Sequence, residues 1–94
     1  MIVRFSVEPI ERGQYDYRVT HEGENLYDDS GLQSIEACII AATEGLGQDA
    51  VAAEIAYKGI ISGTYALASL ALASGQIAQH ALQTTEAIEE AMGS

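Results

Sequence analysis

The sequence predicts an α+β fold, in which an N-terminal antiparallel β-hairpin or three-stranded meander is followed by two or three helices. Two observations predict this arrangement. Apolar residues alternate with polar ones near the N-terminus, and they recur every three or four residues later in the chain. The first period separates the faces of a strand, whereas the second forms one face of a helix. With 94 residues, the chain has the length of one domain, covering residues 1–94.

The alternation is clearest in two short segments. Residues 3–8 are Val-Arg-Phe-Ser-Val-Glu, and residues 15–20 are Tyr-Asp-Tyr-Arg-Val-Thr. Both predict half-buried strands with one apolar and one polar face. Pro9 cannot donate to a strand ladder and should mark a strand end or a sheet edge. Glu22-Gly23 is a plausible tight turn, after which residues 25–27 are expected to form a short third strand.

A helix is expected after the strands. Ser30 to Gln33 fits a capping box, in which each side chain bonds the other residue's backbone N–H. Gly45 and Gly47 are expected to end this helix with a left-handed cap. The apolar residues at helical spacing, which should pack on the sheet, are Leu32, Ile35, Ile39, Ala42 and Leu46.

The Ala-rich stretch 49–75 is interpreted as a long, buried middle helix that begins at Asp49. Its internal glycines are tolerable, because each costs only ~1 kcal/mol in a helix. A hairpin turning at Ser62-Gly63 is the alternative. A last helix is expected over 76–92, with these residues inward: Ile77, Ala81, Ile88 and Met92. Its outward residues are Glu86, Glu89 and Glu90.

The charge of the chain limits its partners. Fourteen acidic residues and four basic residues give a formal net charge of −10. Such a surface repels nucleic acid and anionic lipid and attracts basic protein surfaces. Residues 59–78 have the length of a membrane span. Polar side chains and three glycines dilute this segment, so a core or interface helix is expected and no membrane contact.

No recognisable active site emerges from the residues. The single cysteine, Cys38, cannot form an internal disulfide, and Met1 is not followed by a signal-peptide pattern, which predicts a reducing cytoplasm. Cys38 lies in an apolar helix, where an inert buried thiol is expected. A cluster that could suggest a metal site consists of His21, Glu22, Glu24, Asp28 and Asp29, but a helix cap and a solvated hairpin tip explain it without a metal. We therefore expect no enzyme activity, no metal and no cofactor.

Two surfaces are expected to make contacts. Acidic residues that could meet a basic partner are Asp16, Glu22, Glu24, Asp28 and Asp29. Gly59 and Gly63 have the spacing that lets two helices approach closely, and the segment around them carries no charge. This predicts a homo-oligomer, specifically a dimer, with these contact residues: Gly59, Gly63, Ala66 and Leu70.

The order of these segments is similar to that of small acidic phage proteins. The residues that carry the likeness are 3–7 (Val-Arg-Phe-Ser-Val) and 13–19 (Gly-Gln-Tyr-Asp-Tyr-Arg-Val), followed by an Ala-rich helix. In size, charge and layout the chain resembles anti-CRISPR proteins over its first half, with no diagnostic motif and no transferable site residue. The resemblance implies a viral, non-enzymatic inhibitor in the host cytoplasm. Such a protein blocks a basic nucleic-acid-binding surface of a CRISPR effector complex.

Two other functions remain open from the residues alone. One is a structural or regulatory homo-oligomer. The other is a small-ligand-binding protein, with a pocket lined by Tyr15, Tyr17, Tyr27 and Tyr65.

Overall fold

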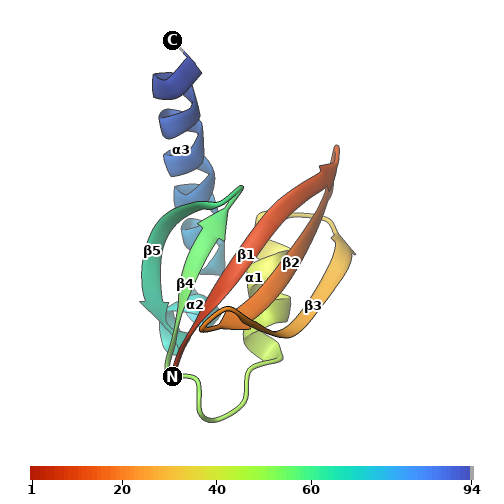
Figure 1. Cartoon of the computed structure of the whole chain (residues 1–94), viewed down its shortest axis with the longest axis vertical. Helices are drawn as coiled ribbons and strands as arrows, with labels where there is room; N and C mark the ends of the chain where they lie inside the picture. Colours follow the sequence, from red (N-terminus) through yellow and green to blue (C-terminus); the bar gives the residue numbers. More distant parts are fainter. Residues whose placement is uncertain (94) are drawn as a thin grey trace.

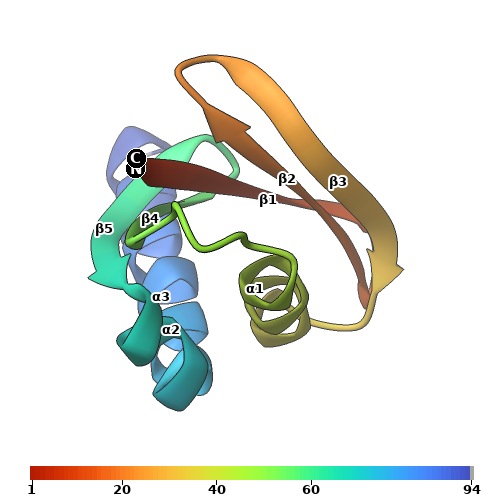
Figure 2. The same ribbon diagram turned by 90° about the horizontal axis from the view of Figure 1, so that it is seen from below.

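The computed structural model describes residues 1–93, which form a five-stranded sheet with three helices on one of its faces (Figures 1 and 2). The strands are β1 (Ile2–Glu11), β2 (Gln14–His21), β3 (Glu24–Leu32), β4 (Ala52–Tyr57) and β5 (Ile60–Ala66). The helices are α1 (Ile35–Glu44), α2 (Leu67–Leu72) and α3 (Ser74–Gly93). The predicted α+β class and the N-terminal three-stranded meander are confirmed.

The sheet has the strand order β3-β2-β1-β4-β5, so the two edges are β3 and β5. Neighbouring strands are antiparallel, except that β1 and β4 run parallel. A parallel pair needs a crossover connection. Here the crossover runs from the edge strand β3 to β4 through α1, which packs beneath β1 and β2 (Figure 2).

The predicted middle helix over 49–75 is wrong, because β4 and β5 form a hairpin there. Its turn is Lys58-Gly59, where both φ angles are positive (54° and 80°). The β2–β3 turn at Glu22-Gly23 has the same form, with φ of 52° and 83°. Two positive φ angles match the twist of a two-residue hairpin. The alternative hairpin was correct in kind, but its turn is not at Ser62-Gly63.

The physical reason for this error is that tertiary packing overrides the helix preference of alanine. Strand β4 lies between β1 and β5, and its residues Ala53, Ile55 and Tyr57 all face the core. Glu54, between them, is only partly buried and faces solvent. The period of two was present in the sequence, but alanines on both faces concealed it.

The ends of α1 also differ from the prediction. Ser30 belongs to β3, and the helix is capped by Ser34, whose Oγ accepts a hydrogen bond from the Ala37 N–H at 3.0 Å. Gly45 follows the helix in a right-handed conformation, with φ of −82°, and not in the expected left-handed one. Gly45 serves a different purpose, since a Cβ there would stand 2.9 Å from the ring of Tyr27.

The core lies between the sheet and the helices, and its largest fully buried side chains include Phe5, Ile39, Ile55 and Leu70. Ile77 and Ala81 are buried, as predicted for α3. The expectation that Ile88 and Met92 point inward is wrong: their exposed fractions are 38% and 82%. The reason is visible in Figure 1, where the C-terminal half of α3 extends past the β4–β5 hairpin. Among the described residues, no helix combines the length and apolar character needed to cross a membrane.

Candidate functional site: the uncovered face of the sheet

Because all three helices pack on one face of the sheet, the other face is left uncovered (Figure 2). Alternation along β1 places Arg4, Ser6 and Glu8 on this face, opposite the core residues. The register then brings the polar residues of β2 beside them: Thr20 lies opposite Arg4, Arg18 opposite Ser6, and Asp16 opposite Glu8. The two strands therefore build one polar surface.

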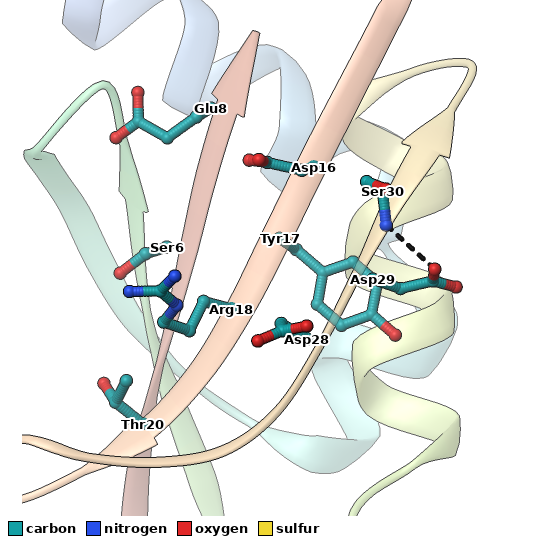
Figure 3. A pocket seen from close by; sticks show the side chains of 9 residues that line it. All are labelled: Ser6, Glu8, Asp16, Tyr17, Arg18, Thr20, Asp28, Asp29 and Ser30. Atoms are coloured by element: carbon teal, nitrogen blue, oxygen red, sulfur yellow. Dashed lines mark hydrogen bonds between the residues drawn. The ribbon is translucent and has the colours of Figure 1, made fainter. Parts of the chain in front are cut away.

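We call the central part of this surface the open-face patch and define it as Ser6, Glu8, Asp16, Arg18, Thr20 and Asp28 (Figure 3). These residues line a shallow hollow of about 540 Å³ that Asp29 and Ser30 complete at the β3 side. Its walls hold four carboxylates and a single guanidinium, that of Arg18. The patch is therefore acidic, with hydroxyl groups between the charges.

Glu8 and Asp16 are directly opposite each other across the β1–β2 pair. Like charges in this position destabilise a sheet. In the part of the chain that the structure describes, neither carboxylate forms an ion pair with a base. The ion pairs there are Arg4–Glu54, at 2.6 Å, and Lys58–Glu89, at 3.4 Å. Within the described residues, the two acids thus lie opposite each other without a basic ion-pair partner.

Asp28 and Asp29 partly serve the local structure of β3. Asp28 Oδ2 accepts a hydrogen bond from Asn25 Nδ2 at 3.0 Å, and Asp29 Oδ1 accepts one from the Ser30 N–H at 2.8 Å (Figure 3). They do not support the start of α1, which Ser34 caps. Asp28 lies opposite Arg18 on β2, so its carboxylate faces the patch.

The structure gathers only some of the acids that the sequence suggested. Asp16, Asp28 and Asp29 line the same hollow. Glu22 lies in the β2–β3 turn at the far end of the hairpin, beside Arg4 and Glu54 in a second shallow hollow. Glu24 begins β3 next to that turn and lines neither hollow.

Glu8 and Arg18 were not among the predicted contact residues, although they are central to the patch. The signal that could have found them is the alternation itself, because it places both on the solvent side of their strands. What the alternation does not give is the register that sets Glu8 against Asp16.

The residues predicted for a dimer contact lie in different surroundings from those expected. Gly59 is in the β4–β5 turn, while Gly63 and Ala66 belong to strand β5. Leu70 is fully buried in the core and is not available to a partner. A helix-to-helix contact through these residues is therefore excluded, since only Leu70 is helical.

The tyrosines proposed as a ligand pocket do not surround one cavity in residues 1–93. Tyr17 and Tyr27 pack edge to face, with ring centroids 6.4 Å apart, and the Tyr27 hydroxyl donates a hydrogen bond to the Ala42 carbonyl. Tyr15 lines a groove between α1 and α3, whereas Tyr65 lines a separate hollow beside α2 and α3. These rings mainly fill and border the core.

Burial shapes the chemistry of the ionisable groups in the core. It raises the pKa of the Tyr27 phenol to about 12, with a smaller contribution from Tyr17. It also raises the pKa of the Cys38 thiol to about 11, helped by Asp16 and Asp29. A fully buried thiol with a raised pKa is a poor nucleophile. Among the described residues, no group of three or more His, Cys, Asp or Glu side chains is arranged to hold a metal ion.

Comparison with known proteins finds no matching family model, no similar curated protein and no similar solved structure.

Proposed function

We propose that this chain is a non-enzymatic inhibitor that binds a basic surface of another protein through the open-face patch. The observation that carries the proposal is the opposed pair Glu8 and Asp16, neither of which has a basic ion-pair partner in the described chain. A neutral or basic residue at either position would favour folding. Binding to the Lys or Arg side chains of a partner would explain why acids occupy two positions where they do not favour folding.

The rest of the patch fits such a partner. Asp28 adds a third carboxylate within the patch, and the hydroxyls of Ser6 and Thr20 both donate and accept hydrogen bonds. The Arg18 guanidinium could donate hydrogen bonds to a carboxylate or carbonyl group of the partner at the rim of the partner's basic site. Carboxylates on three neighbouring strands would meet a partner's guanidinium groups in the bidentate geometry that makes such contacts specific.

Occupying a basic groove would also exclude the nucleic acid that the groove normally holds, since both bind through the same Lys and Arg side chains. This supports a nucleic-acid-binding complex of host defence, such as a CRISPR effector complex, as the class of partner. It agrees with the resemblance of the first half of the chain to anti-CRISPR proteins. The net charge of −10 further favours fast association with a basic surface.

The test uses two single charge reversals with the same change in net charge. Glu8→Lys removes an acid from the patch and faces Asp16, so it should keep or raise the melting temperature. Glu86→Lys makes the same change on α3, away from the sheet face. Both would be measured by surface plasmon resonance against purified CRISPR effector complexes, with thermal unfolding of each variant alongside.

We expect Glu8→Lys to lower the association rate at least roughly tenfold while Glu86→Lys has a much smaller effect, because steering depends on charge near the contact. Equal effects of the two variants would show that only net charge matters and would contradict the patch. Failure of the wild-type chain to bind any such complex would contradict this class of partner.

A further inference from the structure

Strand β5 is an edge strand without charged residues, and natural sheets rarely leave such an edge unprotected. It pairs with β4 on one side, and within the described residues its other side has no strand partner. Its seven residues, Ile60–Ala66, include no charged side chain. The opposite edge, β3, carries Glu24, Asp28 and Asp29. Charges on an edge block pairing with other chains, so β3 is protected and β5 is not.

The absence of charge extends beyond the strand. All fourteen acidic and four basic residues lie outside residues 59–85, the segment that forms β5, α2 and the first half of α3. Figure 2 shows these three elements together on one side of the molecule. Three large apolar side chains are exposed there: Ile61 on β5, at 47%, Leu72 on α2, at 89%, and Leu82 on α3, at 38%.

We infer that β5 is the contact between two copies of this chain, which pair their β5 strands antiparallel about a two-fold axis. The two five-stranded sheets would then continue as one ten-stranded sheet. Outward-facing N–H and C=O groups of each strand would bond those of the other. A two-fold contact uses the same patch twice, so an uncharged strand is complementary to itself.

Charge selects a second copy as the occupant. Two molecules with a net charge of −10 repel each other, and the repulsion is smallest where the facing segments carry no charge. A basic partner would instead be drawn to the acidic part of the sheet, which lies toward the other edge. This dimer contact leaves the open-face patch free and is independent of the function proposed above.

The experiment compares matched substitutions on the two edges. Ile61→Lys places a charge on β5, and Leu26→Lys places the same charge on β3, where Leu26 is similarly exposed at 41%. Light scattering at tens of micromolar should find a dimer for the wild type and for Leu26→Lys, and a monomer for Ile61→Lys. Circular dichroism establishes that each variant is folded.

If Ile61→Lys fails to fold, Thr64→Lys replaces it, because Thr64 is exposed on β5 and lies opposite Glu54 of β4, which would accept a lysine. Hydrogen exchange adds a second readout: β5 amides should exchange more slowly as the wild-type concentration rises, while β3 amides should not. A wild type that is monomeric at about 100 μM overturns the inference. So does a dimer that survives the β5 lysine, or one that Leu26→Lys disrupts.

Discussion

At the scale of single residues, the buried phenols and thiol make the fold sensitive to alkali. Burial raises the pKa of Cys38 to about 11 and of Tyr27 to about 12, from ordinary values of 9.0 and 10.0. Burial also raises the pKa of Tyr17 and of Tyr57. The folded state therefore holds these protons more tightly than the unfolded chain does.

The sign of the resulting pH dependence follows from proton linkage. Where the folded state binds more protons than the unfolded state, the free energy of unfolding falls as the pH rises. The contribution of these groups is fully present below their unfolded pKa values, near 9 and 10, and is lost as the pH rises through the folded values near 11 and 12. We expect the melting temperature to fall steeply between about pH 9 and about pH 12.

Thermal unfolding followed by circular dichroism across this range measures the effect. Cys38→Ala removes one of the titrating groups and should flatten the lower part of the profile. The same buried thiol should react slowly with a thiol reagent until denaturant is added. A flat profile, or fast reaction of the native protein, would mean that this part of the core opens readily.

At the scale of elements, α3 is one helix with two environments. Its first half packs on the sheet, and the Thr85 hydroxyl donates a hydrogen bond to the Tyr57 carbonyl at 3.3 Å. Ile88 and Met92 continue the spacing of the buried residues, but the sheet no longer lies beneath them. We expect the amides of residues 78–85 to exchange slowly with solvent and those of residues 88–92 to exchange quickly, because packing supplies most helix stability.

Hydrogen-exchange mass spectrometry, or NMR, resolves the two halves of α3. Protection should fall after Thr85, which is the last buried residue of α3. Strong protection of the amides up to Met92 would contradict this and would show that the end of α3 is covered in solution. A second copy of the chain would then be the first partner to test.

How far the elements could be predicted depends on how cleanly each pattern shows in the sequence. The strands β1 and β2 alternate large apolar with polar or charged residues, so their two faces can be recognised from the sequence alone. In β4, by contrast, Ala52 and Ala56 on the outer face resemble Ala53 on the inner one, and alanine favours a helix. Only the position of β4 between β1 and β5, a long-range feature, decides the matter.

The candidate site was predictable in part for a similar reason. The outward direction of Asp16 follows from local alternation, but its position opposite Glu8 depends on the register of β1 and β2. That register shifts between Pro9 and Glu11, so that Pro9 lies opposite Tyr15 while Glu11 lies opposite Gln14. Without the shift, core residues of one strand would face solvent residues of the other. Pro9 marks the irregularity but does not reveal its consequence for the charges.

At the scale of the whole molecule, charge is distributed along the sheet. The acidic patch lies over β1, β2 and β3, whereas β5, α2 and the first half of α3 carry no charged residue. In the inferred dimer, the two β2 strands are seven strand positions apart, or roughly 34 Å at ~4.8 Å per strand before twist is considered. Two outward patches at this spacing would allow a dimer to contact a partner at two sites, which strengthens binding through effective concentration.

This distribution predicts opposite responses to salt for the two kinds of association. Screening weakens the repulsion between two copies of charge −10, while it also weakens attraction between the acidic patch and a basic partner. Raising the salt from about 0.01 M to about 0.1 M shortens the Debye length from about 30 Å to about 10 Å. Over this range we expect the dimer to become tighter and binding to the basic partner to become weaker.

Sedimentation equilibrium of the chain alone measures the first response, and surface plasmon resonance with the partner measures the second. The control is Glu86→Gln/Glu90→Gln, which removes two negative charges from α3, outside the patch and outside β5. Because it lowers the repulsion between copies, this variant should dimerise more tightly than the wild type at about 0.01 M salt and respond less to added salt. A dimer that dissociates as salt rises would instead be held by opposite charges, and the uncharged edge at β5 would then be the wrong surface.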